Sequence, residues 1–170
     1  MKKLSRFSLI WLTVAAVFLS MSTAVAQDKK FTKELCLTFD ELPASREFGD
    51  VDVKGIDSMI LKTLKEHKIK AAGFVVGSYI EESFDILGEW LNNGHTLGSM
   101  TYSNQDFHQI DLQSFTKDIA MGAQALEPLL AGFGQKKRYF RFPYLHYGTK
   151  FEDKDAAMIF LEDRNIVVAH

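Results

Sequence analysis

The chain has 170 residues, of which 46% are hydrophobic and 25% charged, so it carries enough apolar material for one domain with its own core. Its 20 Lys and Arg face 22 Asp and Glu, a formal net charge of −2. A mildly acidic chain with scattered lysines argues against nucleic acid as the main partner. The composition fits a neutral ligand or a small cationic one.

Residues 1–26 have the pattern of an export signal. Three basic residues among the first six precede an uncharged apolar stretch from Leu9 to Met21, and Ala24-Val25-Ala26 forms a small-x-small cleavage site. An uncleaved membrane anchor is the alternative, but the apolar run is short for a membrane span. We therefore expect export to the periplasm or the cell exterior, with membrane contact only through this signal. The mature domain would span 27–170, with 17 basic and 22 acidic residues.

After the leader, strand-like apolar runs alternate with helical spacing of apolar residues. The alternation predicts an α/β fold with a parallel sheet. Asn92-Asn93-Gly94 predicts a helix end, and Gly122 weakens the middle of the longest helical pattern. In chain order, strands are predicted at 35–39, 71–76, 95–99, 139–142 and 166–169, and helices at 56–64, 84–91, 112–129 and 156–161.

Cys36 is the only cysteine, so the chain can form no intramolecular disulfide. Its neighbours Leu35 and Leu37 predict a buried, small apolar side chain. A nucleophilic thiol is the alternative, which the absence of a nearby histidine in the sequence disfavours. Trp90 shares helical spacing with Phe84 and Leu87, which favours a core position over a sugar-stacking one.

Polar residues follow several predicted strands at their carboxyl ends, where parallel α/β folds build ligand sites. Asp40 and Glu41 put two carboxylates at one such end, where one can bind a cation and the other act as a base. A solvated acidic turn before Pro43 is the alternative. Arg141, between two phenylalanines, needs an anionic partner if it is buried, and Asp40 is the candidate.

Three segments together resemble the first three motifs of the polysaccharide deacetylase family, the NodB-homology domain of carbohydrate esterase family four. They are Leu37 to Glu41, Gly94 to Asn104, and Arg138 to Tyr144, and their order and separations fit. The resemblance implies a distorted parallel (β/α) barrel. Because the chain stops before the family's remaining motifs, we expect the barrel to be incomplete at its C-terminus.

The resemblance also implies a chemistry: hydrolysis, with a divalent metal such as zinc, of N- or O-acetyl groups on a chitin-like or peptidoglycan saccharide. Such an enzyme is a hydrolase acting on carbon–nitrogen, non-peptide bonds. The implied roles are general base for Asp40, metal ligand for Glu41, orientation of the base for Arg141, oxyanion stabilisation by the backbone N–H at Tyr144, and substrate contact for Pro143 and Tyr144.

Besides Glu41, which stands where the family normally has aspartate, two positions depart from the family pattern. Met100 and Asn104 stand where the resemblance implies the two metal-binding histidines. A thioether and a neutral amide are poor zinc ligands, so we expect a pseudoenzyme with lost or weak activity. A shifted loop that brings His108 and His146 to the metal is one alternative. Others are a non-catalytic carbohydrate-binding or regulatory module, and a truncated gene product.

Overall fold

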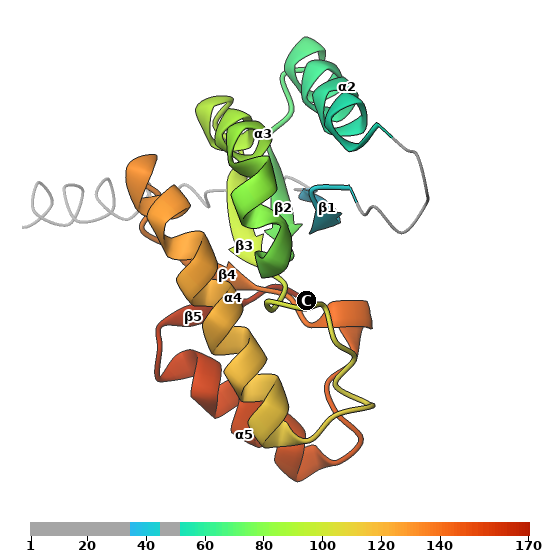
Figure 1. The fold of residues 1–170 in the computed structure, drawn as a ribbon, viewed down its shortest axis with the longest axis vertical. Helices are drawn as coiled ribbons and strands as arrows, with labels where there is room; N and C mark the ends of the chain where they lie inside the picture. Colours follow the sequence, from blue (N-terminus) through green and yellow to red (C-terminus); the bar gives the residue numbers. More distant parts are fainter. Residues whose placement is uncertain (1–34, 45–51) are drawn as a thin grey trace, which may run out of the picture. The chain divides into compact units, whose positions relative to one another are not determined.

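Five parallel strands form one sheet in the order β1-β2-β3-β4-β5 (Figure 1). The computed structural model describes residues 35–44 and 52–170, so the expected export signal at 1–26 lies outside the described residues. The parallel sheet with intervening helices confirms the predicted α/β class. The strands are β1 Leu37–Leu42, β2 Ala71–Val75, β3 Thr96–Ser99, β4 Arg138–Phe140 and β5 Ile166–Val168.

Each pair of neighbouring strands is joined by a helix: α2 Val53–Glu66, α3 Ile80–Asn92, α4 Leu112–Gly132 and α5 Phe151–Glu162. Each helix contacts the next one along the chain. When the strand order never reverses and every crossover connection is right-handed, all the helices lie on one face of the sheet. This is the arrangement of a (β/α) barrel, whereas a doubly wound sheet reverses its order. Among the described residues β1 and β5 are the two edges of the sheet.

The sequence encodes the helix ends through local hydrogen bonds. The side chains of Asp52 and Asp111 cap α2 and α4 by accepting from the backbone N–H groups of Gly55 and Ser114. Gly94 follows α3 with φ 76°, as the predicted Asn-Asn-Gly ending requires. Within the described residues no helix is both long enough and apolar enough to cross a membrane.

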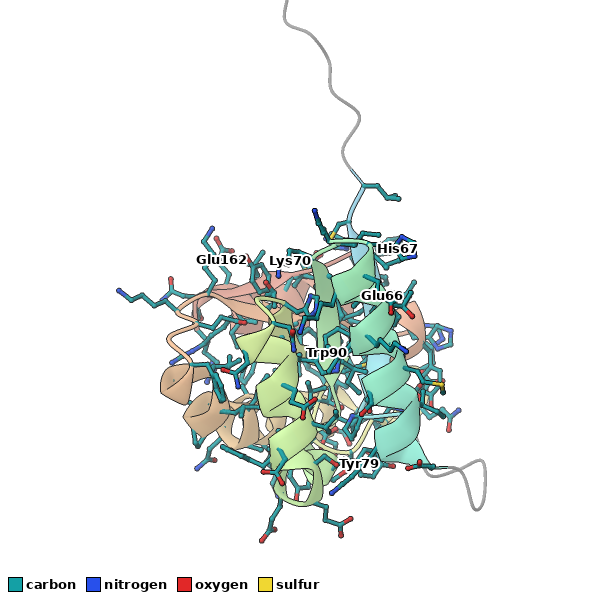
Figure 2. All side chains as sticks on the ribbon, turned by 90° about the horizontal axis from the view of Figure 1, so that it is seen from above. Glu66, His67, Lys70, Tyr79, Trp90 and Glu162 are labelled. Atoms are coloured by element: carbon teal, nitrogen blue, oxygen red, sulfur yellow. The ribbon has the colours of Figure 1, made fainter. Side chains whose placement is uncertain are left out.

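Apolar side chains between the sheet and its helices form two buried clusters. Trp90 lies in the first, fully buried, with its ring edge-to-face against Phe39 at 5.4 Å between centroids (Figure 2). Its predicted core position is confirmed. The second cluster fills the space around β4, β5, α4 and α5 and contains Phe107, Phe115, Ile119, Phe140, Phe142, Ala157, Leu161 and Ile166.

The prediction of a buried Cys36 is wrong, because the thiol is exposed. Cys36 precedes the first residue of an edge strand, and its leucine neighbour at 35 is 95% exposed. Both residues that precede β1 are thus open to solvent in the described part of the chain. Local apolar flanks predict burial only where a second layer covers them.

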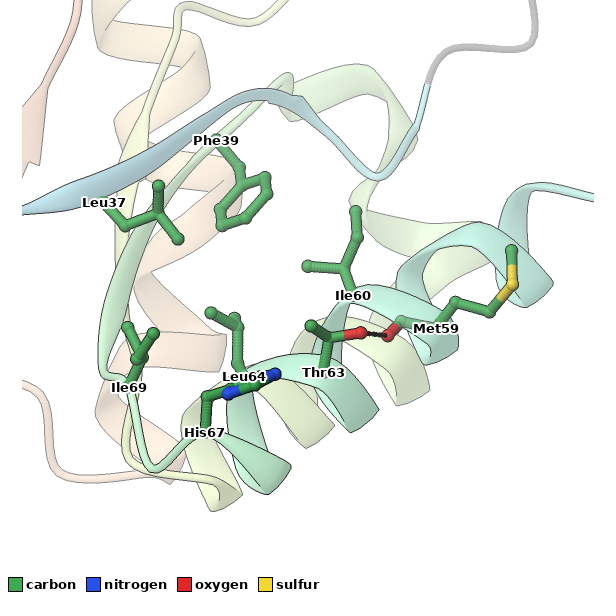
Figure 3. A pocket seen from close by; sticks show the side chains of 8 residues that line it. All are labelled: Leu37, Phe39, Met59, Ile60, Thr63, Leu64, His67 and Ile69. Carbon is green, nitrogen blue, oxygen red and sulfur yellow. Dashed lines mark hydrogen bonds between the residues drawn. The ribbon is translucent and has the colours of Figure 1, made fainter.

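An apolar hollow of about 320 Å³ opens between β1 and α2 (Figure 3). Leu37 begins β1, and His67 and Ile69 lie between α2 and β2, so the hollow reaches the amino-terminal end of the sheet. Figure 2 shows His67 and Lys70 at one end of the molecule and Tyr79, which follows β2, at the other. The residues predicted to be functional lie near the end of β1 and after β3 and β4, at the carboxyl ends of the strands. The hollow therefore lies away from them.

Candidate functional site

Arg141 and Asp40 form an ion pair across the sheet. Nη1 of Arg141 donates to Oδ1 of Asp40 at 2.7 Å and to Oγ1 of Thr38 at 2.9 Å. The Arg141 side chain is 9% exposed and that of Asp40 39%, so the guanidinium is fixed within the fold and the carboxylate reaches solvent. The ring of Phe74 lies under the guanidinium, 4.2 Å from its carbon. The predicted pairing of Arg141 with Asp40 is confirmed.

Glu41 lies where β1 loses its regular pairing with β2. The register shifts between Phe39 and Leu42, and Glu41 has φ 58°, in the left-handed region. Strict alternation would send two adjacent side chains to opposite faces of a strand. The irregularity breaks this alternation, and the half-buried Glu41 follows Asp40 at the carboxyl end of the sheet.

Met100 and Asn104 follow β3 in different surroundings. Met100 is 2% exposed, and its backbone N–H donates to the carbonyl of Val75 at 2.8 Å. Asn104 has φ 56°, and its N–H donates to Oγ1 of Thr101 at 3.1 Å. Its side-chain oxygen Oδ1 is buried and accepts no hydrogen bond from any described residue. The methionine is therefore a core residue, and the side-chain oxygen of Asn104 is unsatisfied among the described residues.

Helix α4 holds the backbone of this loop in place. The carboxylate of Asp118 accepts from the N–H and the hydroxyl of Ser103, at 3.2 and 2.9 Å, and its carbonyl accepts from the N–H of Tyr102 at 3.1 Å. A Cβ placed on Gly122 would lie 2.5 Å from the carbonyl oxygen of Thr101. Only a glycine allows α4 to approach the loop this closely. The sequence showed this residue only as a weak point in a helix.

Pro143 and Tyr144 lie in a short 3₁₀ turn, Pro143–Leu145, that follows β4. Pro143 is buried, whereas Tyr144 is 55% exposed and has φ 56°. The turn is closed by the N–H of His146, which donates to the carbonyl of Pro143 at 3.0 Å. This backbone turns the Tyr144 side chain outward beside the loop that follows β3.

A pocket of about 550 Å³ brings two of the predicted residues together. It is lined by Asn104, Gln105, Asp106, Gln109, Ile110 and Tyr144. The loop after β3 and the turn after β4 thus form one polar hollow. Asp40, Glu41 and Arg141 are not among the residues that line it.

A cluster of Asp106, His108 and His146 adjoins this pocket, and each residue offers one metal-ligand atom, all within 4.8 Å of one another. Nδ1 of His146 lies 2.8 Å from Oδ1 of Asp106, and the two imidazole rings stack at 3.8 Å. The His108 backbone N–H, which donates to Asp106, is the main reason that the pKa of this carboxyl lies below its usual value. Sequence reasoning considered the two histidines only as substitutes at the family position and missed Asp106. The Asp-x-His spacing at 106–108 was the available signal.

His95 has a structural position. It is 5% exposed, and its Nδ1 accepts from the N–H of Ala71 at 3.2 Å. Burial, and then the charge of Lys70, lower its pKa, which favours the neutral ring. It lies edge-to-face with Trp90 at 5.2 Å, inside the core.

Comparison with known proteins identifies relatives of this chain. Residues 27–158 match the family model described as polysaccharide deacetylase. A peptidoglycan-N-acetylglucosamine deacetylase of Bacillus cereus is 32% identical over 111 residues, 65% of this chain and 36% of that protein. The deacetylase PgdA of Listeria monocytogenes is 33% identical over 85 residues, 50% of this chain and 16% of its own length. The chain thus spans about a third or less of these two relatives.

Solved structures share the fold. The Bc1960 peptidoglycan N-acetylglucosamine deacetylase superposes with a TM-score of 0.62 at 24% identity, over 79% of this chain and 55% of that one. BA3943 of Bacillus anthracis, described as a pseudoenzyme of carbohydrate esterase family four, superposes with a TM-score of 0.61 at 17% identity, over 81% and 43%. The family model covers most of the sequence, and these structures share its architecture. The chain belongs to the polysaccharide deacetylase family.

Proposed function

We propose that the chain is an exported polysaccharide deacetylase-like protein whose family metal position no longer supports zinc-dependent hydrolysis. The observation that carries the proposal is the pair Met100 and Asn104, which stand where the family has its two metal-binding histidines. The signal-like sequence pattern of residues 1–26 supports a periplasmic or extracellular location.

The residues at the family position do not fit zinc. Zinc takes about three protein ligands from imidazole, thiolate or carboxylate. Glu41 alone belongs to this set, and its backbone lies in the left-handed region. The thioether of Met100 is a soft ligand on a side chain that is buried in the core, with 2% of the residue exposed. Asn104 offers only a neutral amide oxygen. One carboxylate cannot hold the ion against water.

The carboxylate at the position of the base is still paired with its arginine. Asp40, at the position of the base, accepts a charge-assisted hydrogen bond from Arg141 at 2.7 Å and stays 39% exposed to solvent. Without a metal, a water beside this carboxylate keeps its high pKa, and the acetyl carbonyl has no Lewis acid. Asp40 can therefore orient a water or a sugar hydroxyl but cannot by itself drive amide hydrolysis.

Loss of activity on this fold has a precedent in BA3943, described as a pseudoenzyme, of which one mutant is described as having restored enzymatic activity. The corresponding experiment here is the double substitution Met100→His and Asn104→His. We expect the parent chain to release no acetate from N-acetylated chito-oligosaccharides with added zinc, and the double variant to gain zinc binding. Met121→His, at an exposed methionine of α4, is the matched control for an added histidine.

A second candidate, non-catalytic binding of an acetylated glycan, is favoured by the pocket of about 550 Å³. Its amide and carboxylate groups can hydrogen-bond sugar hydroxyls, and Tyr144 offers a half-exposed ring at its edge. Saturation-transfer NMR with chitin or peptidoglycan fragments should show contacts that Tyr144→Ala reduces. Phe151→Ala, at an exposed aromatic residue outside the pocket lining, should leave them unchanged. No contact with either fragment would remove this candidate.

A further inference from the structure

We propose that Asp106, His108 and His146 form a binding site for a divalent transition-metal ion of the zinc class, separate from the family's metal position. Two imidazoles and a carboxylate are the ligand types that zinc and its neighbours select. The residues come from two segments, the loop after β3 and the turn after β4, which lie 40 positions apart in the sequence. The fold therefore assembles the cluster.

The distances are close to those of a metal site. The three ligand atoms lie within 4.8 Å of one another, and the pair Asp106–His146 is already at 2.8 Å. A tetrahedral zinc ion with bonds of about 2.0–2.2 Å needs ligand atoms about 3.3–3.6 Å apart. The Asp106–His146 pair must therefore open by about half an ångström, and any wider pair must close by at most about 1.5 Å.

The carboxylate is oriented and its charge is available. The N–H of His108 donates to Oδ1 of Asp106 at 2.8 Å, and the side chain of Gln109 donates to Oδ2 at 3.3 Å. Such outer hydrogen bonds fix the carboxylate ligands of metal ions. Among the described residues, the one ion-pair partner of Asp106 is His146. Because no lysine or arginine among the described residues pairs with this carboxylate, its negative charge is available to attract a cation.

The two rings must move apart when the ion binds. They stack in parallel, 5° apart in plane and 3.8 Å between centroids. A ring nitrogen binds a metal in the plane of its ring, so two parallel rings cannot both direct a nitrogen at one ion. His108 is exposed, and in the described structure its ring forms no hydrogen bond, so only the stacking on His146 opposes its rotation. Binding should therefore break the stack by rotating His108.

The site would keep open coordination positions. Three protein ligands leave at least one place for water or a ligand atom. Asp106 also lines the polar pocket with Asn104 and Tyr144, so an ion here would face that pocket. The inference does not depend on whether the family position is empty, because none of the three residues stands at that position.

The test is titration of the full, untagged chain with Zn²⁺ by calorimetry and with Co²⁺ by visible absorption. We expect one equivalent to bind, with a loss of at least tenfold in affinity in His108→Ala, in His146→Ala and in Asp106→Asn. His67→Ala, which removes an exposed histidine at the far end of α2, should match the parent. Circular dichroism confirms that each variant is folded. In two-dimensional NMR, Zn²⁺ should shift the ring protons of both His108 and His146.

Three results would overturn the inference: no Zn²⁺ or Co²⁺ binding by the folded parent, unchanged affinity in the three variants, or an equal loss in His67→Ala. Failure of the proposed function has a different signature. Binding that Glu41→Gln abolishes, together with acetate release by the parent, would place a working ion at the family position. Acetate release is therefore measured on the same samples.

Discussion

Replacing Gly122 by alanine should destabilise the protein, although alanine is the better helix former. In a helix interior this change alone stabilises by about 1 kcal/mol. Here the new Cβ would lie 2.5 Å from the carbonyl oxygen of Thr101 and 2.8 Å from Oγ of Ser99. Backbone atoms cannot turn aside as a side chain can, and overpacking of this kind costs about 1–3 kcal/mol, with the upper part of the range expected at such distances. We expect a net loss of about 1–2 kcal/mol.

Gly132→Ala is the matched control in the same helix. A Cβ there meets no atom within 4 Å, so this variant should be unchanged or more stable by up to about 1 kcal/mol. The assay is urea unfolding followed by circular dichroism, with the midpoint compared at equal slope. In hydrogen exchange, the amides of Tyr102 and Ser103, which donate to Asp118, should exchange faster in Gly122→Ala only. A Gly122→Ala protein as stable as the parent would refute the close approach of α4 to the loop.

Three further substitutions test buried polar groups. Burial raises the pKa of Asp57, so the folded parent loses stability as the pH rises above the usual aspartate pKa. Asp57→Asn should therefore be more stable than the parent at pH 7. The difference in stability between the two proteins should disappear in acid. Burial lowers the pKa of His95, so the parent should lose stability as the pH falls below 6.5. In His95→Asn the side-chain oxygen can still accept from the N–H of Ala71. Urea unfolding at pH 5–7 should show that this variant lacks the parent's pH dependence of stability. Arg141→Lys removes the planar donor that follows β4 and bonds to Thr38 and Asp40 of β1, and it should cost about 1–3 kcal/mol at neutral pH. An unchanged urea midpoint would show that the pair contributes nothing.

The order of elements could be predicted because each apolar period matches one secondary structure. All nine predicted strands and helices correspond to elements of the structure, with ends that differ by up to five residues. Arg141 and Asp40 could be paired in advance, since a buried guanidinium requires an anion. The exposure of Cys36 could not, because burial depends on a covering layer that local sequence does not encode.

Sequence reasoning brought His108 and His146 together only as substitutes at the family position, and it missed Asp106 and the role of Gly122. Asp106 and His146 meet only because β3 and β4 are neighbours in the sheet, and no local pattern joins positions 40 residues apart. Gly122 has the same periodicity as any helical glycine. Glycine is required at this position because the helix lies so close to Thr101, and tertiary packing alone determines that distance.

The most direct test of the central claim is acetate release from N-acetylated chito-oligosaccharides by the parent and by the Met100→His, Asn104→His variant, with zinc and with a chelator. We predict no zinc-dependent release by the parent, even if an ion binds at Asp106, His108 and His146. Zinc-dependent release by the parent, abolished by Glu41→Gln, would contradict it. That result would mean that a methionine and an asparagine at the proposed histidine positions still permit a working metal centre.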